Sequence, residues 1–169
     1  MSETTDFRKA KDGFMATDHQ SPLTDEQRRD FRGLNYYDED PALRLELKLE
    51  EFEDQEPIEM QTSTGDVARY VRLGRVSFTV GGEEAALTVF GDDHGHELFL
   101  PFADTTSGEG TYAAGRYLDV QRAHGGRLLV DFNHAYNPYC AYNESWSCPL
   151  TPFENRLTVP VRAGEKDFK

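Results

Sequence analysis

Basic residues are scarce in this sequence. The 169 residues include 18 lysines and arginines against 31 aspartates and glutamates, which gives a formal net charge of −13, and only five of the basic residues are lysine. A surface of this sign repels the phosphate backbone of nucleic acids, because binding there needs basic groups that displace counterions. Acidic membrane surfaces are disfavoured for the same reason. We therefore expect neither a nucleic acid nor a membrane as a partner.

Long apolar runs and a secretory signal are also lacking. The chain starts Met-Ser-Glu-Thr-Thr-Asp, which is polar and acidic where a signal peptide is basic and then apolar. No apolar run is long enough to span a bilayer. We therefore expect a soluble, cytoplasmic protein. The acidic, lysine-poor composition favours a halophilic cytoplasm, where molar salt screens charges beyond about 3 Å, over an ordinary acidic protein.

Cysteine and tryptophan are rare, and all of them occur in one segment. Residues 131–156 contain both cysteines, the single tryptophan, three of the eight tyrosines and four asparagines. Cys140 and Cys148 could be buried thiols, a disulfide worth about 2–3 kcal/mol, metal ligands or a reactive nucleophile. A metal would need two more donors, for which His94 and His96 are the obvious pair. The cysteine spacing matches no recognised zinc motif, so we expect no metal and no cofactor.

The start of the chain has helical periodicity. Apolar residues recur at helical spacing over 4–16, which predicts a short amphipathic helix. Thr24 and Gln27 match a capping box, which predicts a second short helix over 25–32. We assign residues 1–34 to an N-terminal helical arm that packs on the body of the protein.

From Ala42 onward the apolar residues alternate with polar ones. This period of two is typical of half-buried strands, and turn signals follow every 8–12 residues or so. The pattern over residues 35–169 therefore predicts an antiparallel β domain of about eight strands, either barrel-like or a sandwich. The whole protein is thus expected to be mainly β, with two short N-terminal helices. We expect a bulge at Gly74, a hairpin turn at Gly81-Gly82 and a further turn over 91–95. The expected strands are 43–49, 58–62, 67–80, 85–89, 98–102, 117–120, 128–132 and 157–161.

Two long segments without strand periodicity interrupt this pattern, 103–114 and 134–155. Loops of this length are uncommon in compact domains and are usually functional or disordered. The second contains aromatic residues that are costly to leave in water, so it is expected to be ordered. We predict that both loops close the mouth of the β domain.

Several motifs resemble one family of proteins. Within and beside the two loops the chain reads Phe102-x-Asp104, Gly115-Arg-Tyr-Leu-Asp119, Asp131-Phe-Asn-x-Ala-Tyr-Asn-Pro-x-Cys-Ala-Tyr142 and Glu154-Asn-Arg-Leu157. This ordered string resembles an uncharacterised family, domain of unknown function 1684. With Phe31-x-Gly-Leu34 upstream, the likeness extends over nearly the whole chain. The string is specific as a family marker, but the resemblance implies no reaction and no ligand.

Polar and aromatic side chains gather at the predicted strand ends and in the second loop. One interpretation is a binding site for a small polar or anionic molecule, in which Arg116 and Arg156 clamp the ligand. The other is that these groups form ion pairs and bonds to the backbone that hold the loop in place. If Asp131 is buried, for example, it needs a partner such as Arg116 or Arg156. The predicted ligand-binding residues are Asp104, Arg116, Asp131, Asn133, Tyr136, Asn137, Tyr142, Asn155 and Arg156.

Two further functions could use the same place. A cofactor-independent hydrolase-type enzyme would use Asp104, Asp131, Arg116 or Cys140. A structural or interaction protein would instead have a solid interior with the second loop as a packed plug. A cavity of a few hundred Å³ lined by Arg116 and tyrosines favours binding, and a large exposed apolar patch favours interaction.

Overall fold

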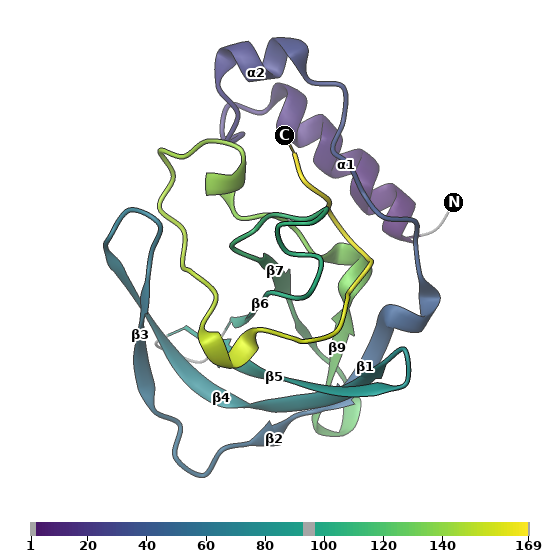
Figure 1. The fold of residues 1–169 in the computed structure, drawn as a ribbon, viewed down its shortest axis with the longest axis vertical. Helices are drawn as coiled ribbons and strands as arrows, with labels where there is room; N and C mark the ends of the chain where they lie inside the picture. Colours follow the sequence, from purple (N-terminus) through teal and green to yellow (C-terminus); the bar gives the residue numbers. More distant parts are fainter. Residues whose placement is uncertain (1–2, 93–96, 169) are drawn as a thin grey trace.

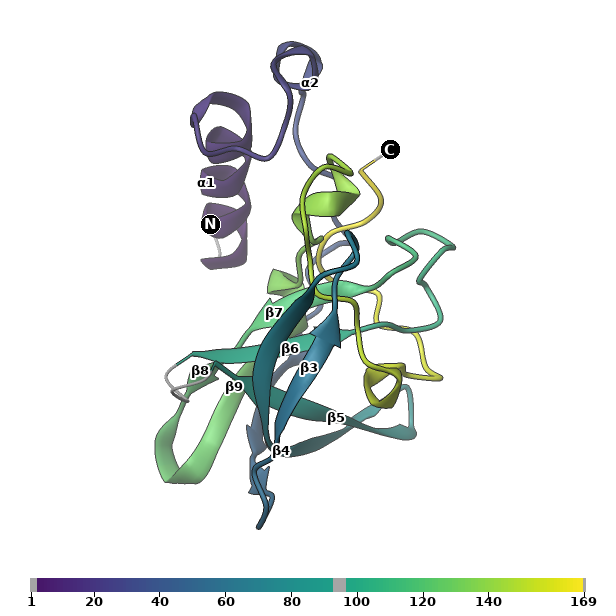
Figure 2. The same cartoon turned by 90° about the vertical axis from the view of Figure 1, so that its left-hand side faces the viewer.

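The computed structural model describes residues 3–92 and 97–168, which form two antiparallel sheets with a pair of helices at one end. Figure 1 and Figure 2 both place helices α1 (Glu3–Thr17) and α2 (Asp25–Asp30) at the end of the molecule opposite strands β4 and β5. Among the described residues, no helix is both long and apolar enough to cross a membrane.

Among the described residues, the larger sheet has six strands and the smaller has three, and all neighbouring strands are antiparallel. The large sheet has the order β2-β4-β5-β6-β7, with β3 paired to β4, and the small one has the order β1-β9-β8. The mainly β, antiparallel prediction is therefore confirmed. The strands are β1 (Arg44–Lys48), β2 (Glu50–Glu51), β3 (Pro57–Gln61), β4 (Val67–Val80), β5 (Glu83–Gly91), β6 (Leu98–Phe102), β7 (Arg116–Asp119), β8 (Gln121–Arg122) and β9 (Arg127–Asp131).

The described strands do not close into a barrel, which was one of the two predicted arrangements. Strand β7 pairs only with β6, and β8 begins after a single residue, Val120, so the chain changes sheets there instead of extending the first one. Both sheets contribute to one apolar core, with Val76, Leu100 and Leu118 from the large sheet and Val130 from the small one. Alternation of apolar residues is the same in both arrangements, so the sequence pattern could not decide between them.

The two helices differ in length from the prediction. Helix α1 has 15 residues and is not short, because it stays packed at both ends, where Thr4 and Met15 are buried. Helix α2 starts at the expected capping box, in which Thr24 and Gln27 exchange hydrogen bonds of 3.1 and 2.9 Å. It ends at Asp30, two residues early, because Phe31 has an extended backbone.

The strand predicted over 157–161 is wrong. This segment runs beside residues 103–105 but makes only isolated contacts, such as the 2.7 Å bond from the Leu157 N–H to the Ala103 carbonyl. The Val161 N–H donates to the Asp104 carboxylate at 2.7 Å instead of to a neighbouring strand. Pro160 has no N–H to donate. A regular ladder therefore cannot form here.

Two of the turn predictions, both in the β4–β5 hairpin, are confirmed. The strand register shifts between Arg72 and Gly74, which confirms the predicted bulge. A Cβ at Gly74 would lie 2.5 Å from the Glu50 carbonyl oxygen, so the close approach of β2 requires glycine. The hairpin turn at Gly81-Gly82 is also confirmed. Most of the turn predicted over 91–95 lies outside the described residues.

The second long loop is irregular but packed, as predicted. It contains the short 3₁₀ turns η4 (Tyr139–Ala141) and η5 (Phe153–Asn155), and η3 (Phe132–His134) joins β9 to it. The other 3₁₀ turns, η1 (Pro41–Leu43) and η2 (His124–Gly126), flank β1 and β9. Loop residue Tyr142 packs with Met15 and Leu23 of the helical end, and both cysteines pack against β7. The second loop therefore joins the helices to the large sheet.

Candidate functional site

Arg116, at the start of β7, forms a buried ion pair with Asp104. Both side chains are 1% exposed, and the guanidinium Nη2 lies 3.3 Å from the carboxylate Oδ2. The guanidinium also donates to the backbone carbonyls of Val161 at 2.8 Å, Ala163, and Glu165 at 3.1 Å. Burial lowers the pKa of Arg116, and the charge of Asp104 opposes that shift. Arg116 is therefore committed to the protein itself.

The Asp104 carboxylate is equally well satisfied. Its Oδ1 accepts from the Thr106 hydroxyl at 2.6 Å and from the Thr106 N–H at 3.1 Å. Its Oδ2 accepts from the Val161 N–H as well as from Arg116. A carboxylate with this set of donors holds the first loop against the C-terminal segment. It is poorly placed to bind a ligand or to exchange a proton with one.

The predicted pairing of Asp131 with Arg116 or Arg156 is wrong. The Asp131 side chain is 12% exposed, and its oxygen lies 3.7 Å from Nε of Arg44, the residue opposite it on β1. Arg156 is exposed. The sequence showed the need for a partner, but Arg116 pairs with Asp104, which closely follows Phe102, the residue opposite Arg116 in the β6–β7 pair.

Asp131→Ala should accordingly have a modest effect on stability. The partner Arg44 is 49% exposed, so water can solvate the arginine after the change. The lost hydrogen bond from the Asn133 N–H, which caps η3, adds to the effect. We expect a loss of about 1–2 kcal/mol in the free energy of unfolding, measured by urea denaturation. A loss above about 4 kcal/mol would indicate a fully buried charge pair instead.

Two of the predicted asparagines use their side-chain amides to bond backbone groups of other segments. The Asn155 amide accepts from the Thr88 N–H at 2.8 Å and donates to the carbonyls of Thr88 at 2.9 Å and Pro101 at 2.8 Å. It thereby joins β5 to β6. Asn133 bonds both backbone groups of Asp40, at 2.8 and 2.9 Å. Both side chains are at most 1% exposed, so their role is to hold segments together.

Tyr142 and Asn137 belong to a polar cluster beneath α1. The Tyr142 hydroxyl donates to Glu165, which also pairs with Lys11 of the helix. Burial raises the pKa of Tyr142, so its hydroxyl keeps the proton that it donates. The Asn137 amide donates to the Lys166 carbonyl at 3.1 Å. These contacts tie the helix, the second loop and the C-terminal segment together.

Tyr136, in contrast, lines an open hollow of about 270 Å³ where β4, β6, β7 and the second loop meet. We call this hollow the aromatic pocket. The residues that line it are Tyr70, Asp92, Glu97, Leu98, Phe99, Tyr117, Asp119, Tyr136 and Pro149.

Four rings form a continuous row in the aromatic pocket. Tyr70 stacks on Phe99 with 5.1 Å between ring centroids, and Phe99 meets Tyr117 edge to face at 4.8 Å. Tyr117 meets Tyr136 edge to face at 5.9 Å. The last two residues also exchange backbone hydrogen bonds of 2.8 and 2.9 Å, which fix the loop against β7. Three strands and the loop thus hold the row in place.

The charges in the aromatic pocket are all negative. Asp92, Glu97 and Asp119 contribute carboxylates, and none of the described residues that line the pocket is basic. The Tyr136 hydroxyl donates to Asp119 at 2.9 Å. Burial raises the pKa values of Tyr117 and Tyr136, so both rings stay neutral phenols. The faces of such rings attract cations, and the Lys11 ammonium already lies 4.8 Å from the centroid of the Tyr136 ring.

Sequence reasoning included Tyr136 but missed the other residues of the aromatic pocket. A signal for two of them was present, because Tyr117 and Asp119 stand at alternate positions of a predicted strand and thus on one face. Tyr70 and Phe99 carried no such signal. They join the row only because β4 and β6 are both in the large sheet.

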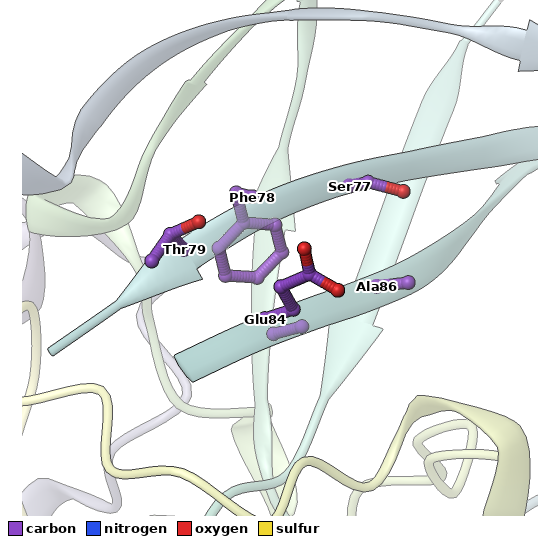
Figure 3. A pocket seen from close by; sticks show the side chains of 6 residues that line it. Ser77, Phe78, Thr79, Glu84 and Ala86 are labelled. Carbon is purple, nitrogen blue, oxygen red and sulfur yellow. The ribbon is translucent and has the colours of Figure 1, made fainter. Parts of the chain in front are cut away.

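A larger hollow of about 530 Å³ lies along the β4–β5 hairpin (Figure 3). Its lining side chains come from two adjacent strands, where Thr79 lies opposite Glu84 and Ser77 opposite Ala86. Glu84 is its single charged residue among those described. Small side chains spread along one hairpin offer few convergent polar groups, so this hollow is the weaker candidate.

Both cysteines are free and buried in this structure. The Cys140 N–H donates to the Cys148 sulfur at 3.3 Å. No group of three or more potential metal ligands is found within residues 3–92 and 97–168. The two histidines considered as additional ligands, His94 and His96, lie outside these ranges.

Comparisons with known proteins agree with the motif resemblance. The chain is similar to an uncharacterised protein of Haloarcula marismortui whose solution NMR structure is known, with 38% sequence identity and a TM-score of 0.73. The match covers 96% of this chain and 91% of the other. No curated protein matches the chain. A family model described as a protein of unknown function (DUF1684) matches residues 29–166, and the chain therefore belongs to the DUF1684 family.

Proposed function

We propose that this protein binds a small organic cation, such as an alkylated ammonium group, in the aromatic pocket. The observation that supports this most strongly is the combination of a row of four aromatic rings with three carboxylates in one hollow. Each of these groups attracts positive charge, and no described lining residue opposes it.

The physical chemistry of the pocket favours an organic cation over other ligands. A cation over a tyrosine or phenylalanine face gains about 0.5–2 kcal/mol per contact, and most when little water remains. A metal ion is strongly hydrated and prefers several oxygen ligands, which aromatic rings cannot supply. An anion would meet the carboxylates of Asp92, Glu97 and Asp119, and none of the described lining residues is basic. The acidic surface, with a net charge of −13, further concentrates cations near the pocket.

This proposal narrows the ligand class that the sequence suggested. An anionic ligand depended on Arg116 and Arg156 as a clamp, and Arg116 is 1% exposed with its donors used internally. A polar ligand with a positive charge remains, with Tyr136 as one wall of its site.

The size of the aromatic pocket suits a compact head group. A volume of about 270 Å³ is just below the range of roughly 300–1,000 Å³ that is typical of ligand pockets. An adjoining hollow of about 390 Å³ shares Glu97, Leu98 and Asp119 with the pocket and extends to Arg122. A polar tail on the ligand could therefore continue along β7 and β8.

The proposal is tested by titrating the whole protein with choline and with its neutral isostere, in which carbon replaces the ammonium nitrogen. We expect choline to bind with a Kd of about 1 mM. The binding is measured by NMR, from chemical-shift changes at Tyr70, Tyr117 and Asp119. The neutral isostere should bind at least ~5-fold more weakly, because it lacks the charge that the rings and carboxylates attract.

Two variants test whether choline binds in the aromatic pocket, and a third is their control. Tyr70→Leu removes one ring and should weaken choline binding about 10-fold, and Asp119→Asn should weaken it about 5-fold. Glu59→Gln, which neutralises an exposed carboxylate on β3, should leave it unchanged. Equal binding of both compounds, or shifts confined to other parts of the protein, would overturn the proposal.

A further inference from the structure

Cys140 and Cys148 lie together in an aromatic cluster beside β7. They pack with Tyr117, and the rings of Tyr112 and Tyr139 pack against this cluster. The Cys140 N–H donates to the Cys148 sulfur at 3.3 Å. The Tyr112 hydroxyl lies 3.6 Å from the Cys140 sulfur. Two thiols that are eight residues apart are thus held in contact, with a phenol beside one of them.

The surroundings favour the thiolate of Cys140. The pKa of Cys140 falls to about 6, chiefly because the Cys148 thiol donates a hydrogen bond to its sulfur. Burial opposes this shift, and hydrogen bonds from the hydroxyls of Tyr112 and Ser63 add to it. The shared hydrogen bond and burial raise the pKa of Cys148, which keeps its proton. The other ionisable groups around the pair are Tyr117, Tyr139 and Glu144. These contacts favour the thiolate at Cys140 and the protonated thiol at Cys148.

Access to the pair is narrow. Cys140 is 5% exposed and Cys148 is 6% exposed. Such low exposure favours a small oxidant over a bulky disulfide reagent. The residues between the cysteines include exposed Glu144 and Ser145, so the covering loop has one side in solvent.

We propose that Cys140 and Cys148 form a peroxide-reactive thiol pair, in which Cys140 attacks a small hydroperoxide and Cys148 resolves the product as an intramolecular disulfide. In the first step an S–O bond forms at Cys140, the O–O bond breaks, and the distal oxygen takes up a proton and leaves as water or an alcohol. Sulfur loses two electrons to the peroxide and becomes a sulfenic acid. In the second step the Cys148 sulfur forms the S–S bond, the S–O bond breaks, and the hydroxyl leaves as water with the proton of Cys148.

The first test uses the reduced protein and stoichiometric hydrogen peroxide. We expect the intact mass to fall by two hydrogen atoms, peptide mapping to find Cys140 linked to Cys148, and dithiothreitol to reverse the change. Between pH 5 and pH 8 the rate should rise only about 10-fold, because a thiol of pKa about 6 is already ionised near neutrality. An ordinary thiol would gain nearly a thousandfold over the same range.

Variants separate the two roles. Cys148→Ser should stop at the sulfenic acid, trapped by dimedone at Cys140, and Cys140→Ser should react at least ~10-fold more slowly than the unchanged protein. Tyr112→Phe, a change at a positioning residue, should move the pH profile to higher pH while still allowing the disulfide. The peptide map of the unchanged protein decides the matter even if a variant fails to fold. Linkage between molecules, no linkage, or equal rates in both serine variants would overturn the proposal.

Discussion

Arg116→Met is expected to lower the free energy of unfolding by about 3–5 kcal/mol. The change leaves the Asp104 carboxylate, 1% exposed, without its charge partner in the interior. It also removes the donor for the carbonyls of Val161 and Glu165. Urea denaturation followed by circular dichroism measures the loss.

Two further variants separate charge from packing. Arg156→Met alters an exposed arginine and should stay within about 0.5 kcal/mol of the unchanged protein. The double variant Asp104→Asn with Arg116→Met removes both charges. Its loss in the free energy of unfolding should be about 2 kcal/mol smaller than the sum of the losses in the two single variants. If Arg116→Met behaves like Arg156→Met, the buried pair does not stabilise the fold as described.

Gly115→Ala should be similarly destabilising, by about 3–5 kcal/mol. Gly115 has φ +103°, where side chains with a Cβ are strained, and an added Cβ would lie 2.5 Å from the Phe102 carbonyl oxygen and 2.7 Å from the Thr151 hydroxyl. Phe102 of β6 pairs with Arg116, the residue after Gly115, so the backbone of β6 cannot move away without displacing Arg116. Thermal and urea denaturation measure the effect.

Gly125→Ala is the matched control for that change. Gly125 also has a positive φ, +70°, but an added Cβ there has nothing within 4 Å. It should therefore lose only the conformational term of about 1 kcal/mol. Equal losses at both glycines would mean that the close approach at Gly115 contributes nothing.

Local features of the fold could be predicted from the sequence, because each depends on neighbouring residues. The capping box at Thr24, the bulge at Gly74 and the alternation along β4 are features of this kind. The departure from a closed barrel depends on where the chain changes sheets, which periodicity does not encode. The loss of the expected strand over 157–161 depends on a carboxylate 57 residues away that takes the Val161 N–H.

The candidate site was predictable only in part, for a related reason. Most of the predicted binding residues are polar side chains in loops or at strand ends, and in the structure most of them make contacts that hold segments together. Asn155, for instance, uses its whole amide to join two strands. The aromatic pocket depends on rings from three strands, and their closeness follows from strand order.

The contacts of Arg116 also bear on how the protein is made. Its carbonyl partners lie 45 to 49 residues further along the chain, at Val161 to Glu165. During synthesis, a nascent chain that has emerged only as far as the second loop contains both Asp104 and Arg116, but the three carbonyl acceptors of the guanidinium are still inside the ribosome. The interior around Arg116 can therefore close fully only after residue 165 has emerged.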